Sequence, residues 1–166
     1  MKPLLIVSVM TISVLASAQS KGTAKLYGYV QEVSGGKRPE ISGNTEPSRG
    51  PRKNYMLYAV SSTRIYPTSV WVEGVQYGVA PKTISSTPVE YANENNIGSP
   101  KQTLVPSTKQ KVVQLILNST PQRKGSSQSA SSMAKSNDVV LVYKLGDKSY
   151  YTLLKNLSPL EAAAMQ

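Results

Sequence analysis

The chain has 166 residues, with 19 Lys and Arg against 9 Asp and Glu, and its formal net charge is +10 at pH 7. It contains no Cys and no His, which excludes a disulfide framework, a Cys-anchored lipoprotein, a Ser-His-Asp triad and the usual zinc ligands. Ten Tyr and one Trp supply all the aromatic side chains, because Phe is absent.

Residues 1–18 have the pattern of a secretory signal peptide. A positive charge precedes an apolar run from Leu4 to Leu15, and Ala16-Ser17-Ala18 gives the small-x-small pattern before Gln19. A membrane anchor is the alternative, but a spanning helix needs about 20 apolar residues. We therefore expect a cleaved signal peptide and a single β-rich domain over residues 19–166, with no transmembrane segment after cleavage.

Strand patterns follow in chain order. Residues 25–33 and 54–61 are rich in apolar and Tyr residues, and residues 111–117 predict a strong strand. Residues 64–77 predict a hairpin that turns at Glu73-Gly74, although Glu tolerates positive φ poorly. Prolines interrupt the segment 79–106, which favours it as an edge where a partner adds a strand.

The clearest local unit is a hairpin over residues 138–155. Gly146-Asp147 suits the two central positions of a type II′ turn. This turn predicts that Tyr143 pairs with Tyr150. Both faces of the hairpin are substantially apolar, so we expect it to be central or covered on both sides.

Two long polar segments, near 34–53 and 118–137, predict loops that are rich in Gly, Pro, Ser and charge. Ser158-Pro159-Leu160-Glu161 has the pattern of a capping box, which predicts a short C-terminal helical turn. About seven short strands therefore predict an all-β fold, either a single β-sandwich or a small open barrel.

The aromatic side chains near the first hairpin are candidates for partner binding. Tyr66, Trp71 and Tyr77 form an aromatic platform for a protein or sugar in one interpretation. In the other interpretation Trp71 packs in the core, since its neighbours Val70 and Val72 are also apolar.

The cations of the two polar segments are candidates for anion binding. If both segments lie at one end of the domain, their side chains form a basic rim. The alternative is a pair of solvated loops that bind nothing, and the scatter of the cations argues against nucleic acid. The candidate residues are Lys37, Arg38, Arg49, Arg52, Lys53, Arg123 and Lys124.

The acidic residues give no sign of a catalytic pair. Within residues 19–166 no two of them lie closer than four positions apart in the sequence. We therefore expect no catalytic residues, no metal and no cofactor. An enzyme based on carboxylates, Tyr or Lys remains an alternative.

The end of the leader, Ala16-Ser17-Ala18 followed by Gln19, is similar to the signal peptides of exported proteins of Bacteroidota. Leu26-Tyr27-Gly28-Tyr29-Val30 and Val70-Trp71-Val72-Glu73-Gly74 resemble segments of the small uncharacterised periplasmic or secreted β-domain proteins of that phylum. The resemblance covers a minority of the chain. It implies export to the periplasm or outer envelope of a Gram-negative bacterium, and it implies no functional residues.

These observations favour a non-enzymatic exported β-domain that binds a protein partner, as an accessory or assembly component of a cell-envelope complex. The alternative is binding of an acidic polymer or lipid headgroup through the basic loops. The two hypotheses differ in salt dependence, because an electrostatic site weakens steeply as salt rises.

Overall fold

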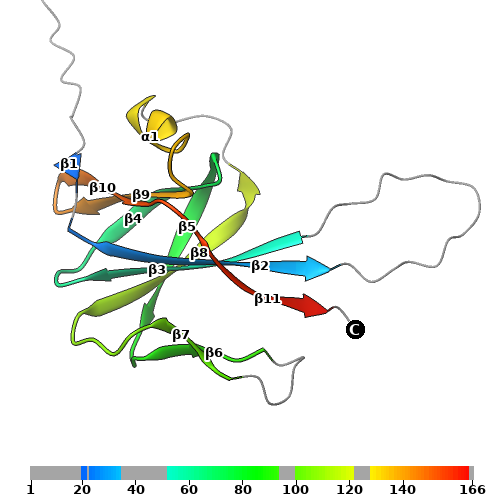
Figure 1. Cartoon of the computed structure of the whole chain (residues 1–166). Helices are drawn as coiled ribbons and strands as arrows, with labels where there is room; N and C mark the ends of the chain where they lie inside the picture. The colour runs from blue at the N-terminus through cyan, green and yellow to red at the C-terminus, as the bar shows by residue number, and fades with distance from the viewer. Residues whose placement is uncertain (1–19, 22, 35–51, 94–99, 122–127, 165–166) are drawn as a thin grey trace, which may run out of the picture.

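The computed structural model describes residues 20–21, 23–34, 52–93, 100–121 and 128–164, and the expected signal peptide lies outside them. Figure 1 shows a strongly curled sheet, a separate strand pair and one short helix. The elements are β1 (Ser20–Lys21), β2 (Lys25–Ser34), β3 (Arg52–Ser61), β4 (Tyr66–Val72), β5 (Val75–Ile84), β6 (Val89–Tyr91), β7 (Gln102–Val105), β8 (Lys111–Pro121), α1 (Gln128–Met133), β9 (Val139–Leu145), β10 (Lys148–Leu154) and β11 (Ser158–Ala164).

The large sheet has nine strands in the order β1-β10-β9-β4-β5-β8-β3-β2-β11, and β6 pairs with β7 separately. The seven inner strands pair antiparallel, whereas β1 and β11 pair parallel to β10 and β2 at the two ends of the sheet. The sheet curls until β10 approaches β2 (Figure 1). The prediction of an all-β fold is confirmed, and its form is an open barrel.

The interior of the barrel is an aliphatic core. Strand alternation places Leu57 and Ala59 of β3 inside, while Tyr58 and Val60 face outward. The buried interior set is Ala24, Leu26, Leu57, Ala59, Ile65, Val70, Val72, Leu115, Val139, Leu141 and Tyr143.

A second, smaller core lies on the outer face of β2, β3 and β8. The β6–β7 pair supplies Leu104 and Val105 to it, and Tyr29 of β2 donates a hydrogen bond from its hydroxyl to the Leu104 carbonyl at 2.6 Å. Outward-facing tyrosines are therefore buried here because a second layer covers them.

Both predicted hairpins are confirmed. Tyr143 pairs with Tyr150 across the β9–β10 turn, and Gly146 there has a φ of 57°. Val70 pairs with Tyr77 across the β4–β5 turn, where Glu73 and Gly74 have φ values of 47° and 81°.

The predicted C-terminal helical turn is wrong, because Ser158–Ala164 forms strand β11. Pairing with β2 satisfies the backbone groups on one side of this strand, and Leu160 is buried in the second core. Pro159 fits an edge strand because it has no N–H to donate. Long-range pairing thus overrides the local capping signal.

The predicted loop over 118–137 is also corrected, since residues 118–121 continue β8 and Gln128–Met133 form α1. Ala130 and Ala134 are buried and fix this short helical segment against the barrel. The segment near 34–53 contains the end of β2 and the start of β3, and residues 35–51 lie outside the described part of the chain.

The segment 79–106, predicted as an edge interrupted by prolines, is divided between the two sheets. Among the described residues, 79–84 of β5 pair with β8 alone and so form an edge, and residues 89–91 and 102–105 form the small sheet. Pro81 is tolerated because the ladder between β4 and β5 ends at Tyr77, so β5 pairs only with β8 at this position.

Strands β2 and β10 meet without a backbone ladder in the described part of the chain, and we call this junction the seam. Thr152 Oγ1 donates a hydrogen bond to the Ala24 carbonyl at 2.8 Å, and Ala24 N–H donates to the Tyr143 hydroxyl at 3.4 Å. At Gly28, an added Cβ would lie 2.6 Å from Leu154 Cδ2 and 2.8 Å from Leu157 Cδ2. The seam is therefore closed by side-chain packing.

Candidate functional site

Strands β3 and β8 are paired over only about half of their length and then separate. They pair from Ser61↔Lys111 to Leu57↔Leu115, and no further pair joins them in the described residues. β3 continues with β2 as far as Val33↔Arg52, while β8 follows β5 to Tyr77↔Pro121. Each strand is thus held by its other neighbour, and a gap opens in the barrel wall.

We call this gap the notch and define it by Arg52–Met56 of β3 and Ile116–Asn118 of β8. A half-open cavity of about 450 Å³ lies in it. Its lining residues are Lys53, Asn54, Tyr55, Met56, Tyr77, Gln114, Leu115, Ile116, Leu117 and Asn118. This volume falls within the range of about 300–1,000 Å³ that is typical of binding pockets.

The lining is apolar toward the interior and mixed toward the outside. Tyr55, Tyr77 and Leu117 pack against the barrel core. On the outer side Ile116 is 46% exposed, one of the few large apolar side chains in the described part of the chain with this exposure. The notch therefore offers apolar contact on both sides of the wall.

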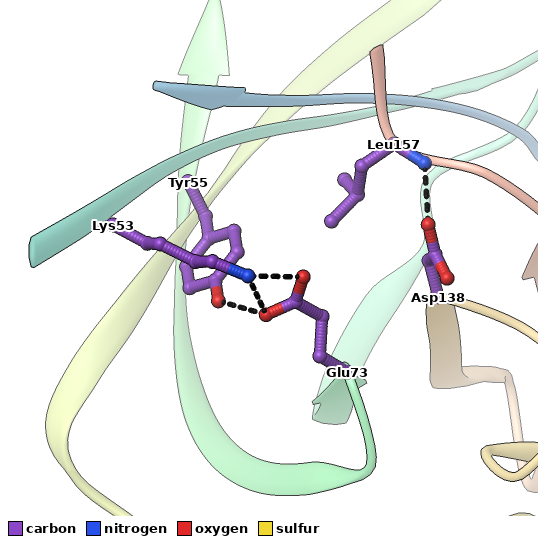
Figure 2. Close-up of polar contacts among 5 residues, drawn as sticks. All are labelled: Lys53, Tyr55, Glu73, Asp138 and Leu157. Atoms are coloured by element: carbon purple, nitrogen blue, oxygen red, sulfur yellow. Dashed lines mark hydrogen bonds and ion pairs between the residues drawn. The ribbon is translucent and has the colours of Figure 1, made fainter. Parts of the chain in front are cut away.

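A polar cluster lies beside the inner rim of the notch (Figure 2). Lys53 Nζ lies 2.7 Å and 2.8 Å from the two carboxylate oxygens of Glu73, and the Tyr55 hydroxyl donates to Glu73 Oε2 at 2.6 Å. The Glu73 N–H donates to the Asp138 carbonyl at 2.8 Å, and Asp138 Oδ2 accepts from the Leu157 N–H at 2.8 Å. The cluster thus ties the β4–β5 turn to β3 and to the start of β9.

In this cluster the pKa of the acid is lowered, and the pKa values of the lysine and the tyrosine are raised. Hydrogen bonds from Lys53 and then Tyr55 lower the pKa of Glu73, and the bond to Glu73 raises the pKa of Lys53. Burial, followed by the bond to Glu73, raises the pKa of Tyr55. At pH 7 the cluster is therefore a carboxylate, an ammonium and a neutral phenol, a set suited to positioning rather than to proton transfer.

Glu73 occupies a strained backbone position. It is the one non-glycine residue with positive φ in the described part of the chain, and this turn position favours Asn, Asp or Gly. A residue type that is unfavourable for its backbone conformation often occurs where its side chain makes a structural or functional contact. Its carboxylate contacts with Lys53 and Tyr55 account for the presence of Glu here.

The three predicted aromatic residues do not gather into one platform. Tyr77 faces the interior, whereas Trp71 pairs with Gln76 and lies on the opposite face of the sheet. Trp71 is half-buried outside the barrel core, and its buried Nε1–H has no acceptor among the residues that the structure describes. Tyr66 is 51% exposed, with the Arg64 guanidinium 5.1 Å from its ring centroid.

Of the predicted anion-binding residues, the structure describes Arg52 and Lys53. Lys53 is paired with Glu73, while Arg52 is exposed at the end of β3 and has no ion pair with any described residue. The others, Lys37, Arg38, Arg49, Arg123 and Lys124, lie outside the described residues.

The sequence analysis missed the residues that shape the notch, chiefly Tyr55, Glu73 and Ile116. A signal existed for Glu73, because Glu is unfavourable in its predicted turn. No local signal marked Tyr55 or Ile116, since their positions depend on where two strands distant in sequence separate.

A second hollow, of about 590 Å³, lies on the other side of the β4–β5 turn and includes Lys135, Asp138 and Lys155. Nowhere in the described ranges do three His, Cys, Asp or Glu side chains gather closely enough to hold a metal ion. Among the same residues, no helix has the length and apolar character needed to cross a membrane.

No protein-family model, curated protein or solved structure gives a significant match to this chain. The candidate function therefore depends on the geometry of the notch and its polar cluster.

Proposed function

We propose that this chain is an exported, non-enzymatic binding module that recognises a protein partner of the cell envelope through the notch. The observation that carries the proposal is the gap between β3 and β8, where unpaired strand edges, a cavity of about 450 Å³ and the exposed Ile116 coincide. Apolar exposure that adjoins unsatisfied backbone groups is typical of interaction sites.

The polar cluster supports this interpretation. Its three side chains keep their ordinary charge states at neutral pH, and their contacts hold one rim of the notch in place. Because this rim is already fixed before binding, less conformational entropy is lost when the partner binds.

Site-specific photo-crosslinking in the cells that produce the protein tests the proposal. A photoreactive side chain at position 116 is compared with one at position 75, because Val75 is similarly exposed (40%) but lies outside the notch lining. We expect discrete protein adducts from position 116 and none from position 75. Equal labelling from both positions, or monomer alone from both, contradicts the proposal.

A further inference from the structure

We infer that the notch binds one extended segment of the partner as an additional strand in the barrel wall, and that this segment carries bulky apolar side chains and an acidic residue. The inference rests on the proposed function and specifies the mode of recognition. Its support is a comparison of all the strand edges in the described residues.

Most of these edges have features that prevent strand addition. β1 has only two residues, and β11 has Pro159 and a register shift between Leu160 and Ala163. The facing edges of β4 and β5, beyond their short ladder, contain Pro67 and Pro81. Short strands, prolines and bulges are the usual protections of an exposed edge.

The small sheet is protected by its size. β6 has three residues and β7 has four, which is shorter than a typical strand of about five or six residues.

The edges that line the notch differ from all of these. Arg52–Met56 and Ile116–Asn118 contain no proline, and the β3–β8 ladder that leads into the notch has no register shift, while β8 shifts register against β5 only beyond Leu117. Lys53 is a charge of the kind that protects edges, but its ammonium is held by Glu73. The seam is also free of proline, but Leu154 and Leu157 cover it. The notch is thus the one place in the described chain where two proline-free strand edges border a cavity.

The geometry limits how a segment binds. β3 and β8 run antiparallel, so a single inserted strand must lie parallel to one of them and antiparallel to the other. The stretch of β3 that lacks a second neighbour, Arg52–Met56, matches the usual strand length of about five or six residues. A bound segment of this length therefore matches the free edge of β3.

The lining determines the side chains of the bound segment. Alternate residues face inward toward Tyr55 and Leu117, and the others lie outside beside Met56 and Ile116. Apolar side chains therefore suit both sides of the segment near the point where the ladder ends.

Charge gives the acidic preference. The chain carries a net charge of +10, and Arg52, exposed at the end of β3 that borders the notch, has no ion pair with any described residue. A carboxylate at the corresponding end of the segment complements this guanidinium. The overall charge also attracts an acidic partner during encounter.

The test uses a display library of random peptides of about twelve residues, selected on the immobilised chain that begins at Gln19. We expect selected sequences with alternating bulky apolar residues and at least one acidic residue. Ile116→Lys weakens their binding at least tenfold, while the control Val75→Lys leaves it unchanged. Arg52→Glu weakens binding several-fold, and Lys148→Glu, at an exposed position at the start of β10, does not.

Amide hydrogen exchange distinguishes strand addition from other modes. In the peptide complex we expect slower exchange for backbone amides on both edges, within 52–56 and 116–118. A bound peptide that protects neither edge overturns the inference, as does a library without enriched sequences. Binding of an apolar small molecule such as dodecanoate in the notch, with no peptide bound, also overturns it.

The two proposals fail separately. If position 116 crosslinks to an envelope protein but the notch amides exchange at the same rate in that complex, strand addition is wrong and the proposed function stands. If no protein crosslinks to position 116, the proposed function itself fails.

Discussion

The seam and the notch are both places where neighbouring strands of the barrel lack a ladder, yet they have opposite characters. At the seam, Leu154 and Leu157 fill the space above Gly28, and Thr152 hydrogen-bonds Ala24. At the notch the edges enclose a cavity and leave Ile116 half exposed. A missing ladder thus becomes part of the core where small and large side chains interlock, and becomes a candidate binding site where they do not.

The largest expected effect is at Gly28. Gly28→Val places branched carbon atoms where even a Cβ lies within 3.1 Å of three leucine side chains. We expect a loss of about 2–3 kcal/mol in the free energy of unfolding, as is common for overpacked cores. Urea denaturation measures it. Adding Leu157→Ala restores space, so the double variant should lose less than the sum of the two single changes. If the loss of unfolding free energy in the double variant equals the sum of the two single losses, close packing at the seam is contradicted.

The second effect concerns the seam hydrogen bond. Thr152→Val keeps the shape of a side chain that is only 6% exposed, but leaves the Ala24 carbonyl without its donor. We expect a loss of about 1–2 kcal/mol in urea denaturation, since a buried unsatisfied acceptor is unfavourable. Thr152→Ser keeps the hydroxyl and serves as the control. Equal losses of unfolding free energy in the Thr152→Val and Thr152→Ser variants show that packing, and not the hydrogen bond, stabilises this part of the seam.

The third effect is the pH dependence of the polar cluster. The pKa of Glu73 is lower in the folded state, so its contacts stabilise the protein above the unfolded pKa of about 4.3, and this contribution is lost as pH falls through the folded value. Glu73→Gln should therefore reduce stability by less than about 1 kcal/mol at pH 7 and have almost no effect at pH 2. Thermal unfolding of both proteins at pH 7 and pH 2 measures this difference in stability. An equal loss of stability at the two pH values contradicts an ionic contribution.

The smallest effect on stability is expected at the notch itself. Ile116→Lys changes a side chain that is 46% exposed, and such surface changes usually stay within about 0.5 kcal/mol. Urea denaturation beside Val75→Lys provides the matched comparison. A loss above 1 kcal/mol for Ile116→Lys alone places this residue in the core and removes the contrast between notch and seam.

Local patterns predicted those parts of the fold that local forces determine. Gly146-Asp147 fixed the register of the β9–β10 hairpin, and Glu73-Gly74 located the other turn. The C-terminal strand was missed because its backbone is satisfied by β2, more than a hundred residues earlier, while its own sequence favours a helical cap. Contacts between distant segments decide such elements, and local propensity cannot reveal them.

The candidate site was less predictable than the fold. Its residues become neighbours only because β3 follows β2 while β8 follows β5. Neither Tyr55 nor Ile116 differs in sequence context from an ordinary strand residue. The unfavourable Glu73 in its turn was the only available sign, and its meaning depends on Lys53 and Tyr55, which lie about twenty residues away.

The pairing of β11 with β2 has a kinetic consequence. Ser158 lies beside Tyr29, and the seam joins Thr152 to Ala24 across 128 residues, so the barrel wall is completed by contacts between the two ends of the described chain. Folds dominated by such distant contacts form slowly, because long loops must close before these contacts add stability. We therefore expect the barrel to close late in folding.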